Sequence, residues 1–177
     1  MTLDIQALYA LNAFVGRSLL LDNVIFFLAS TLAYVLIALF LIILVTFVQE
    51  QRARLELFTT AFIATVFARF GVTELIRLGY HRPRPFVDLV ANPLFTDPAW
   101  SFPSGHATFF FALSTVVYLS HRGWGVLFFT LSVVMTVARV AAGVHYPSDV
   151  IGGAIIGILV AYVSHILVLR FWPKAPH

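Results

Sequence analysis

The sequence predicts an all-α integral membrane protein, a helical bundle of five to six transmembrane helices. Of its 177 residues, 60% are hydrophobic and 11% are charged, whereas soluble domains carry about 25% charged residues. The mean hydropathy is +0.95, and apolar stretches of the roughly 20 residues that cross a hydrocarbon core recur along the chain. Neither a repeat nor a Gly/Ser- or Pro-rich linker divides the sequence. We therefore expect residues 1–177 to form a single membrane-embedded domain.

The first two elements are a short helix and a long apolar span. Residues 3–14 place apolar and polar side chains at roughly helical spacing, which predicts an amphipathic helix at the membrane interface. Insertion of this segment as a partial span would give the sixth helix. Residues 24–48 contain no charge and predict the first transmembrane helix. The polar residues 49–54 predict a connection.

Four further spans follow. The second is predicted over residues 57–78 and contains two charged residues, Arg69 and Glu74. A longer loop over residues 80–102 carries several prolines, which argue against a helix there. The third span covers 104–120, a tight turn is predicted at 121–123, the fourth continues to about residue 142, and the fifth covers 150–171.

Composition excludes several classes of site. The chain has no cysteine, so disulfides and thiolate metal sites are excluded. The formal net charge of +3 is too small to indicate a nucleic-acid partner, because membrane proteins often carry such an excess on their cytoplasmic rim. The N-terminus lacks the pattern of a signal peptide, so we expect insertion to use the first span.

Counting spans places three polar clusters on one membrane face: residues 77–85, 103–106 and 139–149. Outside these clusters, the basic residues gather on the opposite face, where we find Arg52, Arg54, Arg122, Arg170 and Lys174. Only Arg17 lies on the cluster face. The positive-inside rule then predicts that the clusters face the periplasm or exterior of a multi-pass protein of the cytoplasmic membrane.

Three arginines in the clusters indicate an anion site. The planar guanidinium of arginine matches phosphate oxygens in a bidentate manner and keeps its charge, so Arg77, Arg84 and Arg139 together can bind a phosphoryl group. Three cations close together would repel one another unless an anion lay between them. The alternative is that each arginine extends separately to the lipid headgroups, as arginines at helix ends often do.

The second and third clusters carry groups that can move protons. Pro103 and Ser104 can open a helix whose free amide groups attract an anion, Gly105 allows close approach, and His106 follows at once. His145 and Asp149 are four residues apart, so the carboxylate can hold one imidazole tautomer and leave the other nitrogen as a base or nucleophile. Alone, the segment at residues 103–106 is explained about as well by a helix start with an interfacial histidine, and a lone His–Asp pair is more often structural.

Taken together, the motifs carry a family resemblance. Arg-x6-Arg-Pro, Pro-Ser-Gly-His and Arg-x5-His-x3-Asp, in this order, resemble the signature of the type 2 phosphatidic acid phosphatase superfamily of membrane lipid phosphatases. The resemblance covers residues 77–149 and, through the apolar segments, most of the chain. Two positions depart from the usual pattern: Arg77 stands where the family usually has Lys, and Ala138 where it usually has Ser.

This resemblance implies a two-step phosphoryl transfer. His145 would attack phosphorus to form a phosphohistidine, Asp149 would orient His145, and His106 would protonate the leaving oxygen. The residues implied to hold the phosphate oxygens are Arg77, Arg84, Ser104, Gly105 and Arg139. Neither a metal nor another cofactor is implied. A zinc site on His81, His106 and His145 is less favoured, because nearby arginines repel a cation.

The expected substrate is a lipid that carries a phosphate or diphosphate. The segment at residues 80–86 resembles the bacterial branch that acts on undecaprenyl diphosphate and phosphatidylglycerol phosphate; we favour undecaprenyl diphosphate, with phosphatidylglycerol phosphate or phosphatidic acid next. Two alternatives remain open, a lipid phosphotransferase and a transporter that binds lipids or anions without hydrolysis. A transporter has no need of His106, His145 and Asp149 at these spacings. The sequence leaves open the oligomeric state and the roles of Arg69 and His81.

Overall fold

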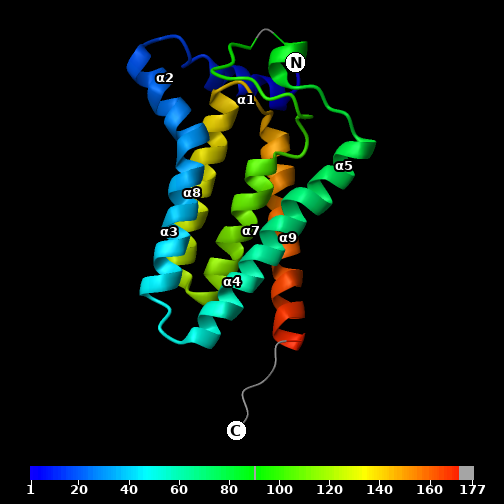
Figure 1. The fold of residues 1–177 in the computed structure, drawn as a ribbon. Coiled ribbons are helices and arrows are strands. Elements are labelled where there is room, and N and C mark those ends of the chain that lie inside the picture. The colour runs from blue at the N-terminus through cyan, green and yellow to red at the C-terminus, as the bar shows by residue number, and fades with distance from the viewer. Residues whose placement is uncertain (90, 172–177) are drawn as a thin grey trace.

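The computed structural model describes residues 1–89 and 91–171. In that part of the chain all regular secondary structure is helical, and the helices form an elongated bundle (Figure 1). Four continuous helical stretches are long and apolar enough to cross a membrane: Leu19–Thr46, Gln51–Gly79, α8 (Arg122–Ala141) and α9 (Pro147–Phe171). The shorter apolar helix α7 (Gly105–Ser120) lies among them. The predicted class, a bundle of transmembrane helices, is confirmed.

The first span combines α2 (Leu19–Phe26), the π-helical segment η1 (Phe27–Thr31) and α3 (Leu32–Thr46). It begins before the predicted start at residue 24. The reason is an N-terminal cap: the Ser18 hydroxyl accepts the amide of Leu21, and Asp22 lies in the first turn, where a carboxylate is favourable. Asp22 therefore belongs to the helix.

The second span combines α4 (Gln51–Val66), η2 (Phe67–Val72), which is also π-helical, and α5 (Thr73–Gly79). Most of the predicted connection at residues 49–54 belongs to α4. Arg54 explains this difference, since its Nη2 donates to the carbonyl oxygen of Val48 at 2.9 Å beyond the end of α3. The turn between the two spans is correspondingly short.

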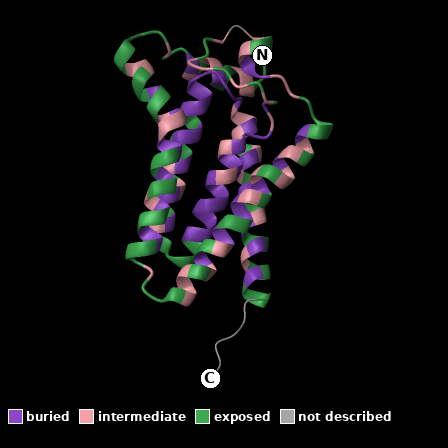
Figure 2. Ribbon diagram, viewed as in Figure 1, coloured by how far each residue is buried: buried purple, intermediate pink, exposed green. Residues whose placement is uncertain are grey.

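Helix α7 forms the centre of the bundle. It packs against α4, α8 and α9, and Figure 2 shows a nearly continuous buried surface along it. Its close approach to α9 depends on small residues, because a Cβ atom at Gly157 would lie only 2.4 Å from the carbonyl oxygen of Thr108. Small residues let the backbones of membrane helices pack closely.

Two connections differ from the prediction. The turn expected at residues 121–123 reduces to His121, because His121 Nδ1 accepts the amide of Trp124 and α8 begins at Arg122. The loop over residues 80–102 was expected to lack helix, yet it contains the single turn α6 (Pro85–Asp88). Pro85 stands at the start of this turn, where a proline has no hydrogen bond to lose.

The N-terminal helix α1 (Leu3–Asn12) lies across one end of the bundle (Figure 1). Its ten residues measure about 15 Å, half the hydrocarbon thickness, so α1 does not span. Leu8 is fully buried, and Asn12 Nδ2 donates to the carbonyl oxygen of Ala141 at 2.8 Å, at the end of α8. These contacts hold α1 against the end of the bundle, and α1 is not among the helices long enough to cross a membrane.

The end of the bundle that carries α1 also carries the three polar clusters. Helices α5 and α8 end there, and α7 and α9 begin there. The predicted arrangement of the clusters on one face therefore agrees with the structure. The basic residues Arg52, Arg54, Arg122 and Arg170 belong to the opposite helix ends, and Lys174 lies outside the described residues.

Candidate active site

Hydrogen bonds join the three clusters. From the first cluster, Arg77 Nη2 donates to the carbonyl oxygen of Pro103 at 3.0 Å in the second. The amide of Ser104 donates to the carbonyl oxygen of Asp149 at 3.0 Å in the third. The first and third clusters meet where Arg84 Nη1 lies 3.3 Å from His145 Nε2. The structure thus brings together residues that the sequence separates by some 70 positions.

Asp149 is fully buried and held by several donors. Its Oδ2 accepts the Ser101 hydroxyl at 2.5 Å and the amide of Tyr146 at 2.8 Å, and its Oδ1 accepts Arg82 Nη1 at 2.6 Å. Nδ1 of His145 lies 3.5 Å from Oδ2 of the same carboxylate. The carboxylate thus faces Nδ1, at a distance beyond a normal hydrogen bond, and with the proton on Nδ1 the Nε2 lone pair faces Arg84.

The ionisation of His145 suits a nucleophile. Burial of the ring lowers the pKa of His145 from 6.5 to about 4; the Asp149 carboxylate opposes this shift, while the charges of Arg139 and Arg84 add to it. The imidazole is therefore neutral near neutral pH, and its Nε2 has an electron pair, which faces Arg84 Nη1. A neutral imidazole with an oriented second nitrogen can attack an electrophile.

Three arginines of the first and third clusters are buried, and two of them have a donor without a partner. Arg77, Arg84 and Arg139 are each no more than 5% exposed. Arg139 Nη1 donates to the carbonyl oxygen of Ala29 in η1 at 3.0 Å. In the described part of the chain, the buried side-chain nitrogen and oxygen atoms without a hydrogen-bond partner are Arg77 Nε, Arg139 Nε and His145 Nδ1. Because buried polar atoms are normally paired, these arginine donors indicate a site for an anionic ligand.

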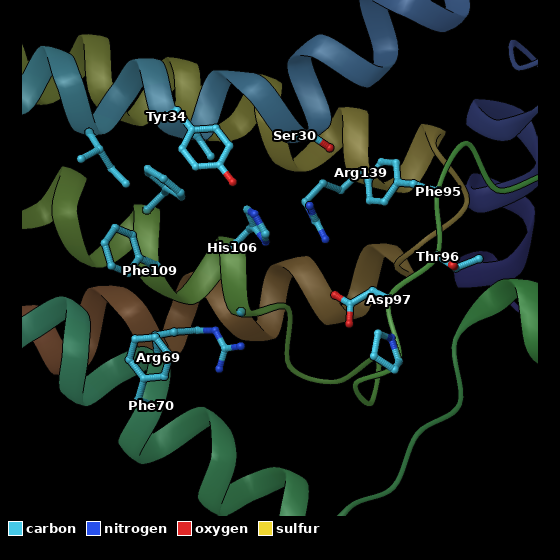
Figure 3. A pocket seen from close by; sticks show the side chains of 15 residues that line it. Ser30, Tyr34, Arg69, Phe70, Phe95, Thr96, Asp97, His106, Phe109 and Arg139 are labelled. Atoms are coloured by element: carbon cyan, nitrogen blue, oxygen red, sulfur yellow. The ribbon is translucent and has the colours of Figure 1, made fainter.

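A cavity of about 460 Å³ opens beside this cluster (Figure 3). Its polar lining includes His106, Arg139, Arg69 and Asp97. Its apolar lining comes from α3, α7 and the loop, with Ala33, Ile37, Phe95, Phe109 and Phe110 among the residues. A cavity with charged groups at one part and aromatic and aliphatic groups at another suits an amphipathic ligand.

Asp97 lines the cavity and also contacts Arg84, which is buried. Its Oδ2 is 2.7 Å from Arg84 Nη2. Burial tends to raise the pKa of Asp97, but the Ala99 amide and the charges of Arg84 and Arg139 outweigh it and lower the pKa. Asp97 is thus an ionised carboxylate paired with Arg84, the arginine that contacts His145. Sequence reasoning missed this residue because nothing in the loop pattern marks it.

Arg82 bridges two carboxylates. Its Nη2 lies 2.7 Å from Oδ2 of Asp4, and its Nη1 binds Asp149. Its guanidinium lies 3.9 Å from the centroid of the Tyr146 ring. No sequence signal could have found this network, since Asp4 and Asp149 lie at opposite ends of the chain.

The remaining predicted residues begin α7. Ser104 is fully buried and its hydroxyl faces the amide of Ala107 at 3.5 Å, so Ser104 opens the helix as predicted. Gly105 and His106 line the cavity. The ring of His81 stacks against Trp100 at 4.8 Å, and no three described His, Asp or Glu side chains are grouped as metal ligands. The zinc alternative therefore has no support in the described geometry.

The fold and this cluster define a class of protein. The profile of the PAP2 superfamily matches residues 56–173, and the chain belongs to that superfamily. It is therefore a membrane-embedded lipid phosphatase.

Individual relatives extend the comparison. The chain is 30% identical, over 87% of its length and 78% of the relative, to undecaprenyl-diphosphatase BcrC of Bacillus subtilis. It is 27% identical, over 90% of its length and 77% of the relative, to a Bacillus licheniformis protein named bacitracin transport permease protein BcrC. Among solved structures, Aquifex aeolicus LpxE superposes with a TM-score of 0.68 at 28% identity, and 97% of each chain is covered.

Proposed function

We propose that this phosphatase removes the terminal phosphate of a lipid diphosphate, with undecaprenyl diphosphate as the favoured substrate, through a phosphohistidine on His145. The observation that carries the proposal is the pairing of a buried, neutral His145 with buried arginines whose Nε donors lack partners. The first feature supplies a nucleophile and the second a site for phosphoryl oxygens. We further propose that residues 1–177 act as a single catalytic unit.

In the first step, the electron pair on His145 Nε2 forms a bond to phosphorus while the bond from phosphorus to the leaving oxygen breaks. His106, which lines the cavity, gives its proton to that oxygen. Arg84, Arg139 and Arg77 stabilise the charge on the transferred group, together with Ser104 and the Gly105 amide. In the second step a water oxygen attacks phosphorus, the phosphorus–nitrogen bond breaks, and His106 takes the proton of the water.

The shape of the cavity supports a lipid substrate. Ile37, Phe109 and Phe110 line it on the side of α3 and α7, so an acyl or polyprenyl chain can extend from the phosphate site toward the bilayer. We propose the outer membrane surface for the site. The basic residues Arg52, Arg54, Arg122 and Arg170 belong to the opposite end, and the positive-inside rule supports this orientation.

Phosphate release by purified protein in detergent tests the proposal. The substrates are a polyprenyl diphosphate, its monophosphate, phosphatidylglycerol phosphate and phosphatidic acid, each assayed with and without excess EDTA. We expect the highest kcat/KM for the diphosphate, activity that survives EDTA because arginines hold the phosphate, and no activity in His145→Gln. Binding of all four lipids without phosphate release would contradict the proposal and favour the transporter alternative, which the permease name of one relative raises.

A further inference from the structure

Arg69 is a charged residue that the proposed mechanism does not use. It lies in the π-helical segment η2, within the second membrane span, where a charge is costly and is usually paired or functional. Its Nη1 forms an ion pair with Oε1 of Glu74. Glu74 Oε1 also lies 3.1 Å from Arg77 Nη1. Glu74 therefore links Arg69 to an arginine of the candidate active site.

The position of the Arg69 side chain depends on Gly105. A Cβ atom built at Gly105 would lie 2.4 Å from Arg69 Nε and 2.9 Å from Arg69 Cζ. The guanidinium thus occupies the space that any other residue at position 105 would fill. In this chain the glycine before His106 has a role besides phosphate approach: it lets a cation lie against the start of α7.

Arg69 also lines the same cavity as His106 and Arg139. Figure 3 shows its guanidinium directed into the cavity on the side of Phe109, whereas Asp97 lies toward the loop. Asp97 contacts Arg84, which contacts His145. The cavity therefore has a reacting side near Asp97 and a second side, near Arg69, from which the apolar lining begins.

The chemistry of the leaving group indicates which ligand the side of the cavity near Arg69 could bind. If His145 attacks the terminal phosphorus and His106 protonates the leaving oxygen, the group attached to this oxygen extends beyond His106. In a lipid diphosphate that group is the lipid-linked phosphate, which leaves as the lipid monophosphate. We propose that Arg69 forms an anion subsite for this lipid-linked phosphate and selects diphosphate over monophosphate substrates. The inference rests on the proposed function and names the residue that would determine its substrate class.

Paired substrates test this role. Polyprenyl diphosphate and polyprenyl monophosphate of one chain length differ only in the phosphate that Arg69 is proposed to bind. We expect Arg69→Gln to lower kcat/KM for the diphosphate by about 10- to 100-fold, the range for a lost hydrogen bond to a charged group, and to change the monophosphate reaction little. Arg69→Lys should keep a preference for the diphosphate that is intermediate between wild type and Arg69→Gln, because an ammonium keeps the charge but not the planar arrangement of donors.

Glu74→Gln is the matched control, since it removes the ion pair but keeps Arg69. If Arg69 served only to pair with Glu74, each variant would lower kcat/KM for the diphosphate and for the monophosphate by the same factor. We expect Glu74→Gln to keep the ratio of diphosphate to monophosphate activity of the wild type. An unchanged ratio in Arg69→Gln would overturn the inference.

Inhibition by inorganic anions separates this inference from the proposed function. In Arg69→Gln the inhibition constant for inorganic pyrophosphate should rise while that for orthophosphate stays constant. Wild-type protein that leaves polyprenyl diphosphate intact would contradict the proposed substrate alone. Equal inhibition constants for pyrophosphate in wild type and variant would contradict the role of Arg69, whatever the lipid substrate.

Discussion

Arg82 Nη1 donates to Asp149 Oδ1 at 2.6 Å and so holds the carboxylate that faces His145. The other end of the same guanidinium lies 2.7 Å from Asp4 in α1. Asp4 in turn accepts the amide of Ser148 at 2.9 Å in the first turn of α9. Helix α1 is therefore connected to the proposed nucleophile through one arginine.

This connection predicts that Arg82 positions Asp149 without binding substrate. Arg82→Gln should lower kcat by about 10- to 100-fold, the range for a lost hydrogen bond to a charged group, and leave KM nearly unchanged. Asp4→Asn weakens the contact between Asp4 and Arg82 but keeps the contact between Arg82 and Asp149, and should lower kcat by a smaller factor. Steady-state kinetics on a soluble short-chain substrate measure both. A rise in KM at constant kcat would instead place Arg82 in the substrate site.

The buried position of His145 predicts its titration. Because its pKa is lowered to about 4, the neutral form that can attack phosphorus should persist as the pH falls through 6.5 and be lost only near 4. Nitrogen-15 NMR of histidine-labelled protein, with the signal assigned by its loss in His145→Gln, measures the pKa without substrate. An ordinary pKa of 6.5 would show that the ring is solvated.

The ion pair between Asp97 and Arg84 predicts competition with the substrate phosphate. Asp97→Asn should lower the inhibition constant for orthophosphate by about two- to five-fold, since a partly exposed ion pair contributes up to about 1 kcal/mol. The amide keeps the shape of the carboxylate, so the loop should be little changed. Weaker phosphate inhibition in Asp97→Asn would mean that Asp97 supports the site rather than competes for it.

The proposed orientation predicts which face is accessible from outside. The chain has no cysteine, so Pro93→Cys in the loop and Gln51→Cys at the start of α4, both exposed positions, can be labelled individually. An impermeant thiol reagent added to intact cells should react with the cysteine at position 93 and not with that at 51. The reverse pattern would place the active site at the cytoplasmic face.

The sequence predicted the spans and the meeting of the clusters because both depend on simple rules. Apolar length determines which segments cross the membrane, and alternation of spans determines which helix ends share a face. The predicted starts of the first two spans are too late, because Asp22 and Arg54 are treated as boundaries. A carboxylate such as Asp22 suits the N-terminal turn of a helix, and Arg54 donates to the carbonyl oxygen of Val48 beyond the end of α3.

Contacts between distant side chains could not be predicted. Four residues belong to the site through contacts that no local sequence pattern indicates: Ser101, Arg82, Asp97 and Arg69. The two π-helical segments were missed for a related reason, since the apolar pattern of a membrane helix is the same whether or not one turn widens. Both segments contribute residues to the cavity, Ser30 from η1 and Arg69 from η2.

The central claim is that His145 carries the phosphoryl group, and rapid-quench labelling tests it most directly. Wild-type protein mixed with a lipid diphosphate labelled in its terminal phosphate, then quenched in alkali within milliseconds, should carry a label that is stable to alkali and labile to acid. The label should map to the peptide that contains His145 and be absent from His145→Gln. Label on the peptide of His106, or rapid phosphate release with no protein-bound label in the wild type, would contradict the account.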